Sequence, residues 1–344
     1  ITTNTENRSN AATQKVGSEN LDLLKMISDE ESVPATIMPE DKGSGDTSKD
    51  APTKAKTLVS ASAQKNISSG EKPNVLFIIS DDQPYNTLGI AGNKEVKTPN
   101  IDALANTGFY LNNMYLPIGH CAPSRASLFT GKMPHNHGVT TNGYILPPNQ
   151  LTLTEILQAG GYDTAIIGKC HLGDVNNTET YKRGFDTRIL FYPDNGVLAY
   201  KPTLGANSWN NFDIMRNGKV EKVENQYVTD YLTDESIKFV DKNNKDGTKP
   251  FFMWLAYNAP HAPHIVPPNP TTSYKASDIT LPDSVNDDRS GKPLQESYTS
   301  AIDNFDAPVM WTPVPTLQEK LDGVKEMKSR TYEILSNMDS NVGR

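Results

Sequence analysis

Only two cysteines, Cys121 and Cys170, occur among the 344 residues. Two thiols cannot form a disulfide framework, and neither lies in a pair with the spacing of zinc ligands. A single disulfide between them stays open at this point. The sequence also lacks any run of about 18 apolar residues, so it predicts no membrane-spanning helix.

An excess of positive charge is absent as well. The chain has 33 Lys and Arg against 41 Asp and Glu, which gives a formal net charge of -8. Domains that bind nucleic acid carry clustered Lys and Arg, so the composition argues against a nucleic-acid partner. No charged segment followed by an apolar one and a cleavage site is visible after Ile1. We therefore expect the start of the gene product to lie upstream.

The first part of the chain is poor in apolar residues. Residues 1–72 are rich in Ser, Thr, Asn, Lys, Asp and Glu, a composition that cannot bury a core. We predict a disordered N-terminal leader or linker there, and a folded domain over residues 73–344.

The folded part alternates strand and helix signals. The apolar run Val75–Ile79 predicts a strand buried on both faces, and it ends in two acids. Pro99 and a Thr152/Glu155 capping box mark two helix starts, and Phe251 opens a second apolar run. This order predicts an α/β fold with a mostly parallel central sheet sandwiched by helices. Residues 186–226 and 265–317 are rich in Pro, Asn and Asp, and we expect long surface loops there.

One short motif, HCAPSRASLFTG (residues 120–131), joins a rare cysteine to an arginine. Pro123 suits the first turn of a helix, which places Cys121 just before that turn, where free backbone N–H groups favour an anion. Arg125 lies four residues on, on the same face. The spacing suggests an oxyanion site, and a buried structural cysteine in a capped helix remains equally open.

This motif resembles the signature of the type I sulfatases, in which a formylglycine-generating enzyme oxidises the cysteine to formylglycine. Segments NVLFIISDDQ, TPNIDALANTGFYLNNMY, GYDTAIIGKCHLG and PFFMWLAYNAPHAPH are similar to others of that family and follow in its order, from about residue 73 to 344. The resemblance implies an alkaline-phosphatase-like fold and a sulfuric ester hydrolase acting on a sulfated carbohydrate.

The resemblance also implies a metal and a nucleophile. Asp81 and Asp82, with residue 121, would bind a divalent cation, Ca²⁺ or else Mg²⁺; carboxylate oxygens are ligands that Ca²⁺ prefers. Taken alone, an Asp-Asp pair could equally be a solvated turn. Cys121, as formylglycine, would be hydrated to a diol that attacks the sulfur of the ester. Arg125 would hold that diol and neutralise charge beside the cation.

Four further residues take roles by the same resemblance. Lys169 and His171 would contact sulfate oxygens and deprotonate the diol, and His261 would bind the sulfate or protonate the leaving alkoxide. His264 is assigned to the substrate pocket. Read without the family, Lys169 would be a surface lysine and the histidines structural ones.

Two departures limit the match. Cys170 stands where the family carries tryptophan, and the family's Asp-Asn pair and further lysine would follow the helix that closes this chain. We therefore expect the N-terminal portion of a sulfatase catalytic domain, weakly active or inactive alone. Sulfated polysaccharides are extracellular, so we expect a secreted or periplasmic protein; the sequons at Asn66 and Asn176 are compatible with this.

Three other functions compete with this one. The same constellation could hydrolyse phosphate or phosphonate esters, or the chain could bind sulfated glycans without catalysis. A cysteine hydrolase using His120 and Cys121 is the weakest, because adjacent residues rarely meet as base and nucleophile.

Overall fold

The computed structural model describes residues 72–173, 181–191, 211–262, 264–282 and 317–344. The predicted leader, apart from residue 72, and both sequons lie outside these ranges. Within them, no helix is both long enough and apolar enough to cross a bilayer.

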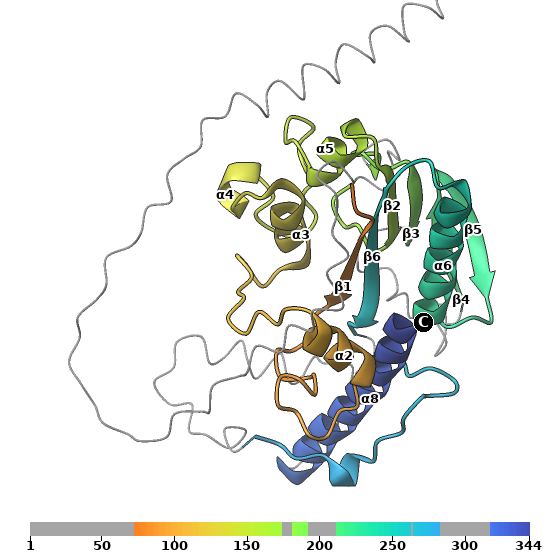
Figure 1. The fold of residues 1–344 in the computed structure, drawn as a ribbon. Helices are drawn as coiled ribbons and strands as arrows, with labels where there is room; N and C mark the ends of the chain where they lie inside the picture. Colours follow the sequence, from red (N-terminus) through yellow and green to blue (C-terminus); the bar gives the residue numbers. More distant parts are fainter. Residues whose placement is uncertain (1–71, 174–180, 192–210, 263, 283–316) are drawn as a thin grey trace, which may run out of the picture. The chain divides into compact units, whose positions relative to one another are not determined.

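A six-stranded sheet forms the centre of the fold (Figure 1). Four strands run parallel in the order β1, β6, β2, β3, and two more extend the sheet antiparallel as β4 and β5. This confirms the predicted mostly parallel α/β sheet. The strands are β1 (Val75–Asp81), β2 (Asp163–Gly168), β3 (Thr187–Phe191), β4 (Asn211–Arg216), β5 (Lys219–Glu224) and β6 (Phe251–Pro260).

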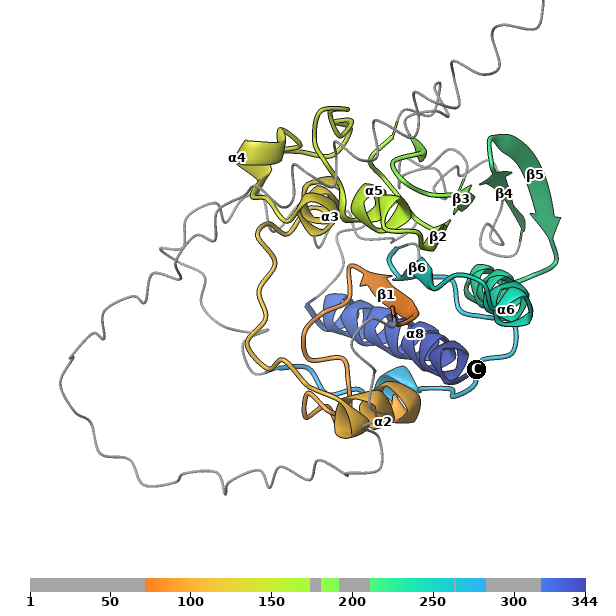
Figure 2. The ribbon, with the colours of Figure 1, turned by 45° about the horizontal axis from the view of Figure 1, so that its top comes forward.

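Helices cover both faces of this sheet, as predicted (Figure 2). The helices α3, α4 and α5 lie on one side, and α2, α6 and α8 on the other. Their bounds are α2 (Pro99–Thr107), α3 (Cys121–Thr130), α4 (Pro134–His137), α5 (Leu153–Ala159), α6 (Val228–Asp246) and α8 (Leu317–Gly343), with a 3₁₀ turn η4 (Ala276–Asp278).

Strand β6 is buried along its whole length and separates two hydrophobic cores. Its side chains alternate between them: Met253 packs with α6 and α8, whereas Trp254 packs with α3. The Trp254 ring stacks between Phe77 and Phe129, with ring centroids 4.4 and 4.2 Å away. Burial on both faces explains why the sequence here is an unbroken apolar run.

The capping signals in the sequence are confirmed. Pro99 opens α2, and Thr152 and Glu155 form a reciprocal capping box at the start of α5. These bonds satisfy backbone groups that have no partner inside the helix.

Strand β1 is less buried than predicted. Leu76 is 47% exposed, and most of the strand is only half-buried. Among the described residues β1 pairs on one side only, with β6. The apolar run correctly predicted the strand, but composition could not show that it ends the described sheet.

The predicted surface loop over residues 186–226 is wrong, because β3, β4 and β5 fall within it. Strands β4 and β5 form a hairpin whose turn residues, Asn217 and Gly218, both have positive φ, 49° and 91°. An Asn-Gly pair between strands is a strong hairpin signal. The polar outer face of β5 obscured it. Of residues 265–317, the structure describes 265–282 and residue 317.

Gly168 allows β2 to lie close to β6 at the edge that carries the site. Its φ is +107°, and an added Cβ would stand 1.9 Å from the Ala256 carbonyl oxygen. We expect Gly168→Ala to lower the free energy of unfolding by more than about 3 kcal/mol, because left-handed strain adds to a backbone clash. Denaturant unfolding measures this.

Gly92 provides the matched control. Its φ is +92°, but an added Cβ would meet nothing within 4 Å. Gly92→Ala should cost about 1–2 kcal/mol from the backbone conformation alone. Equal losses in the two variants would show that the close approach of Gly168 to β6 has no energetic weight.

Candidate active site

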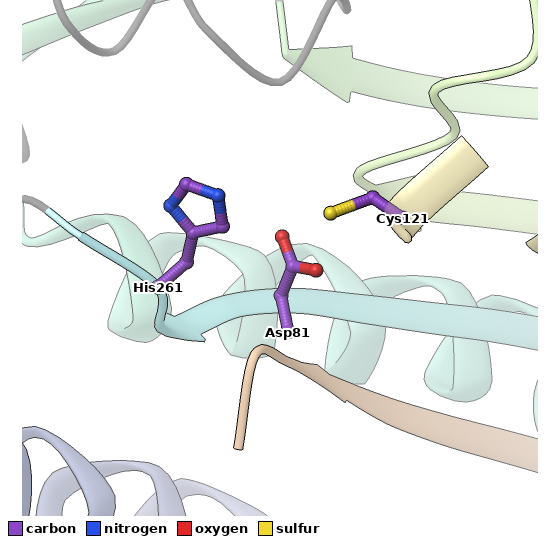
Figure 3. A group of neighbouring side chains, drawn as sticks. All are labelled: Asp81, Cys121 and His261. Atoms are coloured by element: carbon purple, nitrogen blue, oxygen red, sulfur yellow. The ribbon is translucent and has the colours of Figure 1, made fainter. Parts of the chain in front are cut away.

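Three parallel strands bring chemically active side chains to one edge of the sheet. Asp81 ends β1 and pairs in register with Pro260, the last residue of β6. His261 therefore follows beside Asp81, and Lys169 follows the end of β2 on the other side of β6. Carboxyl ends of parallel strands form the functional edge of an open α/β sheet. Figure 3 shows Asp81, Cys121 and His261 at this edge.

Asp81 is the centre of a buried charge cluster. Its carboxylate lies 2.5 Å from Lys169 Nζ and 3.4 Å from an Arg125 guanidinium nitrogen. The three residues are 4%, 1% and 2% exposed. Burial acts to raise the pKa of Asp81, but the charges of Arg125 and Lys169 outweigh it and hold that pKa below its usual value. The carboxylate is therefore ionised at neutral pH.

The Arg125 side chain joins α3 to the sheet. Besides its ion pair with Asp81, it donates a hydrogen bond of 2.8 Å to the Lys169 carbonyl oxygen. One guanidinium thus links α3 to the ends of β1 and β2. Arg125 thus lies beside Asp81, and these two contacts fix the orientation of its guanidinium.

Helix α3 begins at Cys121 itself, whereas the sequence placed this residue just before the first turn. The expectation of free N–H groups here is wrong for the turn that follows. The Ala122 N–H donates to Asn142 Oδ1 at 3.0 Å, Pro123 has no N–H, and the Ser124 N–H donates to the His120 carbonyl. Anion attraction at Cys121 must therefore come mainly from side chains.

The Cys121 thiol faces the acidic pair. Its sulfur lies 3.8 Å from Asp82 Oδ1, and Cys121, Asp81 and His261 offer potential ligand atoms within 4.8 Å of one another. Burial, together with the Asp81 carboxylate, raises the pKa of the thiol above its ordinary value. A protonated thiol argues against the cysteine hydrolase. No disulfide joins Cys121 to Cys170, so the bond that the sequence left open is not formed.

The three candidate histidines differ in their surroundings. The His261 Nε2 atom lies 3.4 Å from Asp82 Oδ2, and its Nδ1 donates to the Ala262 carbonyl oxygen. Burial and the nearby charges of Lys169 and Arg125 lower the pKa of His171 to about 4. His264 is half-buried and lies outside the group formed by Asp81, Cys121 and His261.

Two residues of this edge have left-handed backbones. Asp82 has a φ of 55° and His171 a φ of 62°. Non-glycine residues seldom adopt this conformation, and it is concentrated at functional sites. Asp82 directly follows the end of β1, and His171 lies three residues after the end of β2. At both places the chain turns sharply, which keeps these two side chains at the sheet edge.

Sequence reasoning missed Asn142 and left His137 without a role. Asn142 reaches the first turn of α3, as described above. His137 is fully buried, with Nε2 3.0 Å from Ser127 Oγ. An Asn-Gly pair such as Asn142–Gly143 is typical of a turn and indicates nothing more. The contact of Asn142 with Ala122 joins segments 20 residues apart, so it leaves no local pattern in the sequence.

A sheet covered on both faces, with ionised side chains gathered at its carboxyl edge, is characteristic of α/β enzymes. The sulfatase family model matches residues 73–344. The chain therefore belongs to the sulfatase family, within the alkaline-phosphatase-like superfamily.

Curated relatives agree with this assignment. The N-acetylglucosamine-6-O-sulfatase of Bacteroides thetaiotaomicron is 30% identical over 79% of this chain and 45% of its own length. The ulvan-active sulfatase of Formosa agariphila is 33% identical over 56% of this chain and 36% of its own. The chain thus spans less than half the length of these two relatives.

Solved structures share the fold. A structure in complex with its substrate D-glucosamine-2-N,6-O-disulfate aligns with a TM-score of 0.62 at 23% identity, over 80% of this chain and 61% of the other. The phosphonate monoester hydrolase of Agrobacterium radiobacter aligns with a TM-score of 0.56 at 21% identity, over 79% and 58%. At these identities the likeness establishes the architecture alone.

The charge cluster makes a prediction about stability. Asp81→Asn should lower the free energy of unfolding by about 3 kcal/mol or more, because Lys169 and Arg125 would stay buried without a counter-charge. Asp82→Asn, whose side chain is 60% exposed, should cost less than about 1 kcal/mol. Denaturant unfolding of both variants is the measurement. Similar losses would mean that the buried ion pairs do not stabilise the fold.

His171 makes a prediction about pH. Its pKa is about 4 in the folded chain against an ordinary 6.5, so the unfolded chain binds the proton first as pH falls. Stability should therefore fall between pH 6.5 and 4, by up to about 1.4 kcal/mol per pH unit from this group. Unfolding in denaturant across this range should show a shallower slope for His171→Gln. An unchanged slope in that variant would contradict a buried neutral imidazole.

Proposed function

We propose that this chain carries the catalytic centre of a sulfatase that hydrolyses sulfate esters of a carbohydrate. The observation that carries the proposal is the placement of Cys121, within the C-A-P-S-R motif, against Asp81 and Asp82 at the carboxyl edge of the sheet. Membership in the sulfatase family supports the same chemistry.

Position 121 would act after conversion to formylglycine by a formylglycine-generating enzyme. The encoded thiol is a poor nucleophile here, because its pKa is raised. This conversion is an oxidation that removes the sulfur and turns the CH₂SH group into an aldehyde. Water then adds to the aldehyde and gives a diol. One hydroxyl would attack the sulfur of the ester and displace the carbohydrate alkoxide, which would leave the sulfate bound covalently to residue 121. Loss of a proton from the other hydroxyl would then expel the sulfate and restore the aldehyde.

A divalent cation fits the donor set of the converted site. Carboxylate oxygens of Asp81 and Asp82 and an oxygen at residue 121 are the ligands that Ca²⁺ prefers, and Mg²⁺ is the other candidate. When bound, the cation would supply positive charge that favours the ionised hydroxyl and the sulfate oxygens. Asp81 stays in position for this role because Lys169 and Arg125 hold it.

Lys169 and Arg125 would also draw the sulfate group inward. The two buried, positively charged side chains face one buried carboxylate, that of Asp81, so this part of the site keeps a net positive charge. Such a fixed charge in a site of low dielectric attracts an anionic group more strongly than a surface charge does. The position of Lys169, directly after β2, keeps its ammonium at the sheet edge.

The histidines would move protons. With a pKa of about 4, His171 is neutral at pH 7 and can accept the proton that the diol loses. His261, beside Asp82, would bind sulfate or donate to the leaving alkoxide. His264, half-buried beyond β6, is assigned to the outer substrate pocket.

The substrate class follows from the relatives. Names such as N-acetylglucosamine-6-O-sulfatase and ulvan-active sulfatase denote action on sulfated carbohydrates. Such polymers lie outside cells, so the proposal includes a secreted or periplasmic location.

The chain is proposed to be the N-terminal portion of the catalytic domain, weakly active or inactive alone. Asp81, Asp82 and residue 121 provide fewer oxygens than the six to eight that Ca²⁺ takes. Phe109 and Tyr115 are 95% and 85% exposed, an aromatic surface of the kind that folded domains usually cover. The match to under half of two relatives points the same way.

The test is coexpression of the chain with a formylglycine-generating enzyme. We expect mass spectrometry of the Cys121 peptide to show the exchange of CH₂SH for CHO, and calorimetry to show Ca²⁺ binding that Asp82→Asn weakens at least tenfold. Asp241→Asn, on the exposed face of α6, is the matched charge control. An unconverted peptide would overturn the formylglycine proposal, and rapid turnover of an aryl sulfate would overturn the proposal that the chain is weakly active alone. Faster hydrolysis of an aryl phosphate would favour the phosphatase alternative.

A further inference from the structure

The segment that follows α3 is anchored to that helix by a buried histidine. His137, fully buried, accepts the Val139 N–H at Nδ1 over 3.1 Å. Because Nδ1 accepts, Nε2 carries the proton, and it donates to Ser127 Oγ at 3.0 Å. Val139 is itself fully buried in the core beside α3. Residues 137–139 are therefore a rigid support on the flank of the helix.

Asn142 extends from this support to the start of the same helix. Gly143 has a φ of 88°, which turns the chain directly after Asn142. The side-chain Oδ1 of Asn142 accepts the Ala122 N–H at 3.0 Å. His120, at the N-cap position, makes no side-chain capping bond. Asn142 thus performs from a distance the role that a local N-cap residue usually has.

This bond determines which end of the amide remains available. With Oδ1 held by the helix, the Nδ2 group is the open end of the side chain, and among the described residues it has no hydrogen-bond partner. The residue is exposed, whereas the turn it caps is buried from Ala122 onward. Asn142 therefore presents two N–H donors at the surface beside the first turn of α3, the turn that begins at Cys121.

The charge balance of the site leaves room for such a donor. Asp81 neutralises part of the charge of Lys169 and Arg125, and the N–H groups of Ala122 and Ser124 are already bonded within the protein. A tetrahedral anion has several oxygens to satisfy. A neutral, pre-oriented amide can meet one of them without a desolvated charge.

We infer that Asn142 is a substrate-binding residue whose Nδ2 donates a hydrogen bond to an oxygen of the sulfate group at residue 121, while its Oδ1 holds the start of α3. This inference rests on the proposed function, since it takes a sulfate group as the ligand. It adds a residue from a turn to a site otherwise built on strand ends and a helix.

Two substitutions separate the two ends of the amide. Asn142→Asp keeps the acceptor for the Ala122 N–H and removes the donor, because Asp caps helices as well as Asn does. Asn142→Ala removes both without adding charge. Asn149→Asp is the matched charge control: Asn149 is exposed, and its neighbour Gln150 contacts Lys132, beyond the opposite end of α3.

The measurement is a titration of inorganic sulfate into the ¹⁵N-labelled chain, followed at the Cys121 and Ala122 amides, with thermal unfolding of each variant. Both Asn142 variants should bind sulfate about tenfold more weakly or worse, and Asn149→Asp within twofold of the unsubstituted chain. Only Asn142→Ala should lower the unfolding temperature.

The outcomes distinguish this inference from the function on which it rests. Sulfate binding by Asn142→Ala within twofold of the unsubstituted chain would overturn the role of Asn142 and leave the proposed function intact. If only Asn142→Asp bound sulfate more weakly, the role of Asn142 would likewise be overturned, because the loss would come from repulsion between the new carboxylate and sulfate. An unsubstituted chain that binds no sulfate would overturn both.

Discussion

The buried carboxylate of Asp81 is the contact on which the site depends. Lys169 and Arg125 are almost fully buried, and two positive charges in such a place repel each other and lose their hydration. Asp81 lies between them, so strand β1, strand β2 and helix α3 are joined by one carboxylate. The same arrangement fixes the acid as an ionised group and prevents the two long basic side chains from extending into solvent.

Rigidity follows from where these groups are mounted. Asp81, Lys169 and His261 stand at or just beyond the ends of β1, β2 and β6, and hydrogen bonds fix the register of β1 and β2 against β6. Side chains on such elements lose little further freedom when a ligand binds, which is what a preorganised site requires. The left-handed backbone conformation of Asp82 costs conformational free energy, which the interactions of the surrounding sheet offset.

Local signals in the sequence predicted local structure well. The apolar runs at β1 and β6 and the capping box of Thr152 each depend on neighbours in the chain, so a pattern could reveal them. The edge position of the acidic pair followed from strand ends. The roles of the individual site residues came from the family resemblance, and the structure shows that most of them share one edge.

Features that depend on the tertiary fold were not visible. The residues around Lys169 do not predict its ion pair with Asp81, because 88 positions separate the two residues and β6 lies between their strands. The expectation of free N–H groups beside Cys121 was wrong for the same reason, because the Ala122 N–H donates to Asn142 Oδ1, 20 positions away. The sequence did not predict strands β3 to β5, because their segment has a polar composition. Such a composition is compatible with strands that extend the sheet beyond its buried centre, as β5 does.

The central position of β6 also has a consequence for biosynthesis. Strands β1 and β2 are neighbours of β6 and not of each other, so the sheet edge cannot close until residues 251–260 have been translated. Ribosomes add about 5–20 residues per second, so Cys121 spends on the order of ten seconds in a nascent chain whose sheet is still incomplete. During that interval the Cys121 thiol, which is partly buried in the folded chain, still lacks its neighbour His261.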